Sequence, residues 1–152
     1  MLSKIESEIN DAFMQIYNSV HRVEERMLKH STLDLSISEL DMLETVGKAE
    51  GNGCTISDIA RDNSVTLPTV TVAIKRLEAK GYVEKNRSME DGRVIYVKLT
   101  RKGRKADVAH RYFHERMVRS FIRGVDDGDR EMLLVALKNL GGFLKQAGEE
   151  KL

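Results

Sequence analysis

Four side chains between positions 69 and 76 have the chemistry to bind a nucleic acid. Thr69 and Thr71 carry hydroxyls that can hydrogen-bond to bases or phosphates, and Lys75 and Arg76 can bind phosphate or guanine. The segment LPTVTVAIKRLEAKG has the period of an amphipathic helix, and we expect its opposite face to be buried: Leu67, Val70, Ile74 and Leu77. The outer face starts with small side chains, which would permit close approach to base edges in a major groove. Any amphipathic helix divides in this way, so the interpretation depends on its neighbours.

Charged side chains also flank the turn of a predicted hairpin. The segments YVEKNR and RVIYVKLT alternate like strands, and SMEDG between them is typical of a turn. Arg87 and Arg93 lie on either side of this turn and could enter a minor groove, where A·T tracts attract arginine. Asp91 precedes Arg93 by two residues and could orient its guanidinium. A plain surface hairpin would have a similar composition.

The residues before the amphipathic helix predict the partner that would position it. Thr55 is expected to cap a short helix, TISDIARD, with Asp58 at its favourable N-terminal end. Val65 takes the apolar position of the turn, Thr66 caps the second helix, and Pro68 lies in that helix's first turn, where a missing N–H costs nothing. Two short helices followed by a hairpin indicate a winged helix-turn-helix, a DNA-reading module.

Long helices are predicted on both sides of this module. Residues 3–30 form one, because apolar residues recur at intervals of three and four, and we expect it to be partly core and partly dimer interface. Ser36 caps the next helix, with Glu39 completing a capping box and Gly47 ending it. Helices beginning after Thr100 and at Asp127 complete the chain. The predicted fold is mainly α with a small β-hairpin wing (α+β), in a single chain 1–152 with a DNA-binding part at 36–100 and dimerisation helices at 1–34 and 101–148.

Charge and composition favour DNA binding over other functions. The chain has 152 residues and a net charge of +1, but residues 55–105 hold 12 Lys or Arg and 6 Asp or Glu, so the positive field is confined to the predicted module. No apolar run approaches the ~20 residues of a membrane span, and the N-terminus lacks an apolar signal core, so a cytoplasmic location is expected. No catalytic triad, phosphate loop or pair of catalytic carboxylates is evident, so we predict that the chain is not an enzyme and carries no cofactor.

The motifs of the central segment resemble those of a known family. The stretches TLPTVTVAIKRLEAKGYVEK, SMEDGRVIYVKLT and LTRKGRK, in this order, are similar to the MarR family of bacterial transcription regulators. SISELDMLETVGKA and HRYFHERMV further resemble the FabT-like subgroup, the repressors of fatty-acid biosynthesis. The resemblance covers nearly the whole chain. It implies a homodimer that places two reading helices in successive major grooves of a pseudo-palindromic operator.

The resemblance also implies which residues touch double-stranded DNA. The base and phosphate contacts would fall on Thr69, Thr71, Lys75 and Arg76, and the wing contact on Arg93, oriented by Asp91. Ser57 and Ser64, near helix starts, could contact phosphate.

In the subgroup the co-repressor is a long-chain acyl-acyl carrier protein, and this is expected to be a partner. Because a carrier protein is acidic, its docking surface should be basic, and there are two candidate surfaces: Arg22, Arg26 and Lys29 on the first helix, or Arg111 and Arg116 on the fifth. The acyl chain would need an apolar tunnel, for which the flexible candidates are Met14, Met27, Met42, Phe113 and Met117. Alternatively these residues simply fill the core.

Other effectors remain open. One alternative is a MarR-type regulator that responds to a small phenolic or drug-like molecule, or to zinc. His110 and His114 lie four residues apart, a spacing that suits a metal ion, and Glu24, His30 and others could complete the site. The lipid-synthesis repressors share the HRYFH stretch with no metal role implied, so we predict no metal. Cys54, the single cysteine, is expected to be a small buried residue rather than a redox sensor.

Overall fold

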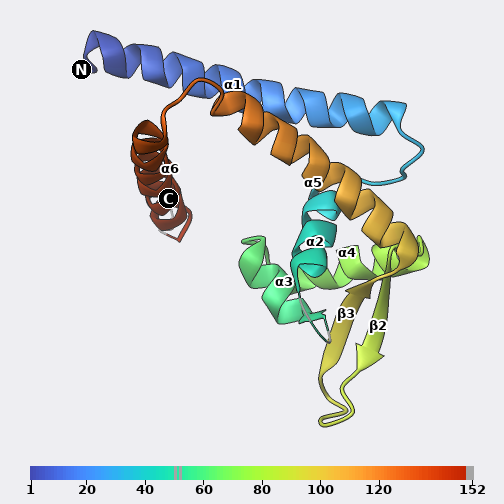
Figure 1. The fold of residues 1–152 in the computed structure, drawn as a ribbon. Helices are drawn as coiled ribbons and strands as arrows, with labels where there is room; N and C mark the ends of the chain where they lie inside the picture. The colour runs from blue at the N-terminus through green and yellow to red at the C-terminus, as the bar shows by residue number, and fades with distance from the viewer. Residues whose placement is uncertain (50, 52, 150–152) are drawn as a thin grey trace. The chain divides into compact units, whose positions relative to one another are not determined.

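The computed structural model describes residues 1–49, 51 and 53–149, and this part of the chain holds six helices and three strands (Figure 1). Two residues of the loop expected after Gly47, positions 50 and 52, and the last three residues lie outside the described part. The elements in chain order are α1 (Lys4–His30), α2 (Ile37–Lys48), β1 (Cys54–Thr55), α3 (Ile56–Asp62), α4 (Leu67–Ala79), β2 (Val83–Arg87), β3 (Ile95–Leu99), α5 (Arg101–Phe121) and α6 (Asp127–Glu149). This confirms the predicted mainly helical fold with a wing.

Short polar side chains fix where the first helices begin. Ser36 and Thr55 each form a capping box, with Glu39 and Asp58 respectively, and so satisfy N–H groups that a helix start leaves open. Hydrogen bonds from Thr55 lower the pKa of Asp58 below its ordinary value, which keeps the carboxylate charged at the start of α3. Thr66 caps α4 with Pro68 in its first turn, as the sequence predicted.

The wing belongs to a three-stranded antiparallel sheet in the order β1-β3-β2, and the hairpin predicted from the sequence forms two of its strands. Cys54 pairs with Val97 on one side of β3, and β2 pairs with β3 from Val83↔Leu99 to Arg87↔Ile95 on the other. The hairpin extends beyond the helices of this part of the chain (Figure 1). The added strand ties the base of the wing to the entry of α3.

The core lies where α2, α3, α4 and the sheet meet. Leu43, Ile59 and Val97 are fully buried there, together with Tyr82 at the start of the hairpin. One expectation was wrong, because Leu67 is 50% exposed; Val65, in the turn before α4, is 36% exposed. Leu67 occupies the first position of α4, before the helix reaches the core, so only three of the four predicted residues of its inner face are buried: Val70, Ile74 and Leu77.

Gly47 does not end α2, because the helix continues to Lys48. A Cβ atom at Gly47 would lie 2.5 Å from Asp107 Oδ2, so the glycine provides the space in which α5 approaches α2. Sequence reasoning mistook this packing requirement for a helix stop.

The chain divides into two compact units, Met1–Arg111 and Tyr112–Leu152, with the boundary inside α5. In the first unit the start of α5 is part of the protein interior, since Ala106, Asp107 and His110 are buried. By contrast α1 has no buried residue, and Ile5, Ile9, Ile16 and most other members of its apolar stripe are exposed. In the second unit the apolar side chains of α6 are likewise largely exposed. Among the described helices, none combines the length and the apolar character needed to cross a membrane.

Candidate nucleic-acid interface

The outward face of α4 carries the predicted reading residues. Thr69, Thr71, Lys75 and Arg76 are all exposed, and Val72, 51% exposed, lies among them. Val70, Ile74 and Leu77 anchor the opposite face in the core. Within the described part of the chain, Lys75 and Arg76 have no hydrogen bond or ion pair, so their charges are available to an external anion.

The threonine hydroxyls of α4 already have partners. Thr71 Oγ1 donates to the carbonyl of Leu67 at 2.8 Å, and the hydroxyls of Thr66 and Thr69 are 2.8 Å apart. A hydroxyl has one hydrogen to donate. In this arrangement Thr71 therefore offers a base only its lone pairs and its methyl group, which suit an exocyclic amino group or a thymine methyl rather than the acceptors of guanine.

Ser57, in the first turn of α3, and Ser64, in the turn between α3 and α4, are exposed as well. Ser64 has φ +54°, the left-handed region that a non-glycine residue rarely adopts, and its N–H donates to Arg61 O at 3.2 Å. Arg61, the nearby cation, is paired with Asp58 and Asp62 at 3.2 and 2.9 Å. We therefore expect Arg61 to contribute less to phosphate attraction than Lys75 or Arg76.

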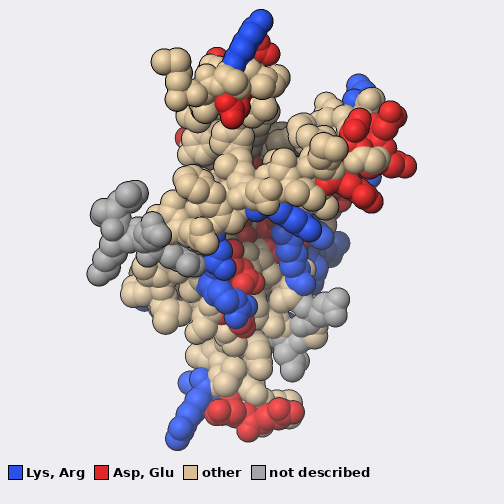
Figure 2. Space-filling view, turned by 90° about the vertical axis from the view of Figure 1, so that its left-hand side faces the viewer, with Lys and Arg blue, Asp and Glu red and all other residues tan. Residues whose placement is uncertain are grey.

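The tip of the wing is organised by side chains that bind its backbone. Ser88 Oγ accepts from the N–H groups of Glu90 and Asp91 at 3.2 Å each, and Asp91 Oδ1 accepts from the backbone N–H of Arg93 at 2.9 Å. The expected role of Asp91 thus changes, because among the described contacts it holds the Arg93 backbone rather than the guanidinium. Arg87 and Arg93 remain exposed on either side of the turn. Figure 2 shows acidic and basic side chains together at the lower end of the molecule, and further basic side chains on the middle of this face.

Comparison with known proteins identifies the module. A family model described as transcriptional regulator SarA/Rot matches residues 26–107. FabT of Streptococcus pneumoniae, solved in complex with DNA, is 37% identical, and the match covers 93% of this chain and 98% of that one with a TM-score of 0.81. The chain belongs to the MarR/SarA family of DNA-binding transcriptional regulators. Regulators of this family are not enzymes, which confirms that prediction.

Two further relatives agree with this family. AbsC, a MarR family transcriptional regulator from Streptomyces coelicolor, has the same fold with a TM-score of 0.75 at 21% identity, over 96% of this chain and 98% of AbsC. YdgJ of Bacillus subtilis, an uncharacterized HTH-type transcriptional regulator, is 28% identical over 106 residues, or 70% of this chain. The match spans 63% of the length of YdgJ.

The residues proposed from the MarR resemblance to line an acyl tunnel occupy different environments. Met42 is 3% exposed within the core, which is the alternative the sequence left open. Met14 and Met27 on α1 are exposed by 47% and 48%. Phe113 and Met117 lie in the other unit, on α5, and are partly buried there. A tunnel formed by these side chains stays a prediction.

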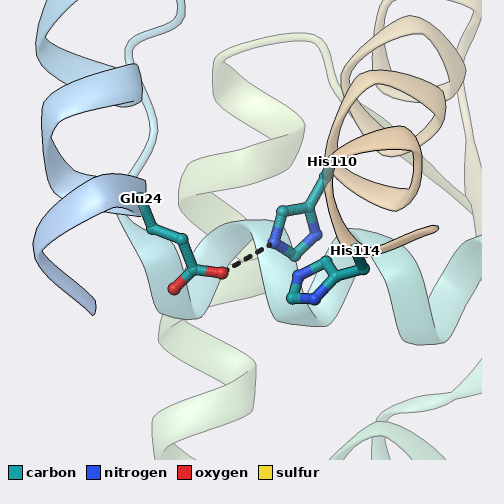
Figure 3. Close-up of side chains that lie close together, drawn as sticks. All are labelled: Glu24, His110 and His114. Carbon is teal, nitrogen blue, oxygen red and sulfur yellow. Dashed lines mark ion pairs between the residues drawn. The ribbon is translucent and has the colours of Figure 1, made fainter. Parts of the chain in front are cut away.

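Of the residues considered as metal ligands, Glu24 and His110 lie close together (Figure 3). His110 is buried between two carboxylates, with Nε2 3.7 Å from Glu24 Oε1 and Nδ1 3.3 Å from Glu44 Oε2. His114 follows four residues later on α5, and His30 is exposed at the end of α1. The sequence did not predict Glu44, whose contact with α5 depends on the fold. His110 of α5 therefore lies between carboxylates of α1 and α2, and these contacts are ion pairs when the imidazole is protonated.

Sequence reasoning also missed a polar contact at the other end of α4. Lys80, the C-cap of this helix, binds the carbonyl of Asp34 and the carboxylate of Glu39. These partners lie 46 and 41 residues away along the chain, so no local motif could have revealed them.

Proposed function

We propose that this protein is a homodimeric repressor of fatty-acid biosynthesis genes that uses a long-chain acyl-acyl carrier protein as co-repressor. The observation that carries the proposal is the 37% identity to FabT over 93% of the chain, since FabT was solved in complex with DNA. The motifs SISELDMLETVGKA and HRYFHERMV, which resemble fatty-acid repressors, support the same subgroup.

In this proposal α4 enters the major groove and the wing enters the flanking minor groove. All nine candidate contacts are exposed in the structure: Ser57, Ser64, Thr69, Thr71, Lys75, Arg76, Arg87, Asp91 and Arg93. A second copy of the chain is supported by the exposed apolar stripe of α1, where Ile5 and Ile9 are 62% and 61% exposed. Contiguous apolar surface of this kind on a small protein is typical of an interface.

The direct test is a selection of DNA fragments from a randomised pool, with and without long-chain acyl-acyl carrier protein. We expect a pseudo-palindromic sequence to be enriched and its complex to be tighter with the acylated carrier in a gel shift. Equal binding with and without the carrier would refute the co-repressor, whereas failure to enrich any sequence would refute DNA reading itself.

Arg93→Ala tests the wing. We expect this change to weaken binding of the selected duplex by about 1–3 kcal/mol while the dimer stays folded. Asp91→Asn is the matched control, because an asparagine oxygen can still accept from the backbone N–H of Arg93, and it should preserve or tighten binding. Unchanged affinity of Arg93→Ala at physiological salt would contradict the wing contact.

The structure favours one of the two candidate docking surfaces for an acidic carrier. Arg111 is paired with the buried carboxylate of Asp107 at 3.0 Å, which leaves it less available. Arg22, Arg26 and Lys29 on α1 are exposed. Charge reversal of Arg22 and Arg26 should therefore abolish the effect of the acylated carrier and leave DNA binding without it unchanged.

A second candidate is a regulator released by a small phenolic or drug-like molecule, and a groove beside α4 favours it. The groove has a volume of about 760 Å³, and its lining includes Met42, Val65, Val72 and the cation Arg76. A ligand there would cover Val72 and Arg76 and so would compete with DNA. The sign of the effect separates the two candidates, since such a molecule would loosen the operator complex and an acyl carrier would tighten it.

A further inference from the structure

We propose that Lys80 is a positioning residue of the DNA site: its ammonium group fixes the end of α4 to the connection between α1 and α2, and it does not bind phosphate. This inference rests on the proposed role of α4 as the reading helix. By its place in the sequence, a lysine at the end of a basic helix is an obvious phosphate ligand. The contacts of Lys80 in the structure indicate a different role.

The donors of Lys80 are fully used within the chain. Its Nζ donates to Asp34 O at 2.8 Å and lies 3.2 and 3.1 Å from Glu39 Oε1 and Oε2. An ammonium group has three hydrogens, and these three acceptors can take all of them. Lys75, five residues earlier on the exposed face of the same helix, has no such partner among the described residues.

Burial makes the contact between Lys80 and Glu39 stronger than an ordinary surface pair. The Glu39 side chain is 9% exposed and that of Lys80 is 27% exposed. Glu39 Oε2 also accepts from the backbone N–H of Ser36 at 2.9 Å, so the same carboxylate starts α2 and holds the end of α4. Removing one partner of such a shielded charged hydrogen bond leaves the other unsatisfied, which is costly.

A second set of contacts holds the same end of α4 against the start of α5. Lys102 Nζ donates to Lys80 O at 2.8 Å and lies 4.1 Å above the Tyr82 ring. Thr100 Oγ1 donates to Gly81 O at 2.7 Å. The C-terminal end of α4 is thereby bound both to the connection between α1 and α2 and to the start of α5.

The connection between α1 and α2, to which Lys80 binds at Asp34, follows directly after α1. Asp34 lies between Leu33 and Leu35, which pack against the core together with Leu28 of α1. A displacement at the end of α1 is therefore passed to α4 through Lys80. Because base recognition needs hydrogen bonds of 2.7–3.2 Å, a small change in the pose of α4 should affect base contacts more than phosphate attraction.

The test compares Lys80→Met, made together with Glu39→Gln so that no unpaired buried charge remains, with the unchanged protein. The probes are the duplex recovered by selection from a randomised pool and a scrambled duplex of the same length, each titrated at several salt concentrations by fluorescence anisotropy. We expect affinity for the selected duplex to fall about tenfold, as the loss of a charged hydrogen bond implies. Affinity for the scrambled duplex and the slope of log K against log salt should not change.

A phosphate contact by Lys80 predicts the opposite pattern. Both duplexes would then bind more weakly, and the slope would fall by about 1. That result would overturn the inference, as would unchanged affinity for the selected duplex. Lys80→Arg should restore most of the specific affinity, because the guanidinium can reach the same acceptors. Lys4→Met made together with Glu8→Gln removes an exposed ion pair of α1 at the same net charge; it is the matched control and should leave both affinities unchanged.

Glu39→Gln alone gives a test by sign. Removal of a negative charge near DNA should by itself tighten binding to both duplexes. If Glu39 holds Lys80 in place, binding to the selected duplex should instead weaken, in a variant that thermal melting shows to be folded at the assay temperature.

Lys75→Ala tests separately the premise that α4 is the reading helix. If Lys75→Ala has no effect, α4 is not the reading helix; if it weakens binding and the variants of Lys80 and Glu39 do not, positioning by Lys80 is wrong.

Discussion

Gly103→Ala should destabilise the protein strongly, although alanine is the better helix former. Gly103 is buried in the first turn of α5, where the helix rests on the hairpin. A Cβ atom there would lie far inside van der Waals contact with the carbonyl oxygen of Tyr82, 3.0 Å from its carbonyl carbon and 3.3 Å from Leu99 Cδ2. The obstacle is backbone, so a rotamer change cannot remove it.

Two opposing contributions decide the magnitude. Replacing glycine by alanine inside a helix stabilises it by about 1 kcal/mol. Against this, overpacking a rigid site costs about 1–3 kcal/mol. The Tyr82 carbonyl also accepts from the backbone N–H of Thr100 at 3.0 Å, and losing this bond costs roughly 1 kcal/mol. The net expectation is a loss of about 1–3 kcal/mol in the free energy of unfolding.

Urea denaturation at fixed protein concentration measures this loss. Gly128→Ala is the matched control, because Gly128 also lies in the first turn of a helix and a Cβ atom there would meet nothing within 4 Å. The loss of stability for Gly47→Ala should be intermediate between those of Gly103→Ala and Gly128→Ala, because the new Cβ would meet the side-chain carboxylate of Asp107, which can shift. If Gly103→Ala were as stable as Gly128→Ala, the packing of α5 on Tyr82 described here would be wrong.

Three further changes have expected outcomes. Ser64→Gly should raise the free energy of unfolding by about 0.5–1 kcal/mol, because it relieves the left-handed backbone at φ +54°; Ser64→Ala should not, and equal midpoints in urea would contradict this. Burial raises the pKa of Cys54 to about 11 from 9.0, so the unfolded chain loses this proton first and stability should fall between these pH values by up to about 2–3 kcal/mol. Cys54→Ala should remove that part of the pH dependence, and an identical slope would refute it. Burial also raises the pKa of Asp107 in the folded protein above its ordinary value of 3.8. The contribution of Asp107 to stability is therefore fully present below pH 3.8, and it is lost as the pH rises through the pKa of the folded state. Asp107→Asn should therefore melt above the unchanged protein at about pH 7, with a smaller difference at about pH 3.

Local signals predicted the elements of the DNA-reading part well. The starts at Ser36, Thr55 and Thr66 follow from capping chemistry, which involves residues three positions apart and is readable in any single sequence. Periodicity placed Val70, Ile74 and Leu77 inside but could not show that Leu67 precedes the region of contact with the core. A glycine stop signal at Gly47 was misleading because glycine serves helix packing as well as helix ends.

For the candidate site, the exposure of the predicted residues could be inferred from the sequence, but their interactions could not. Exposure of the nine predicted contacts agrees with the sequence. However, Asp91 holds the backbone of Arg93, and Lys80 is engaged by Asp34 and Glu39. These differences have one cause: a sequence shows which side chain can donate or accept, but the partner it finds depends on the backbone fold around it.

The absence of buried residues in α1 has a consequence for the cell. In the proposed homodimer, this helix of 27 residues packs on its own chain through Leu28 near its end, and its exposed apolar stripe gains contacts from the second copy, so folding of α1 is coupled to association of the chains. Dilution would then unfold part of the molecule as well as separate it. The amount of regulator present would therefore act as a threshold: below the dissociation constant of the dimer, the two reading helices are not held at the spacing that an operator requires.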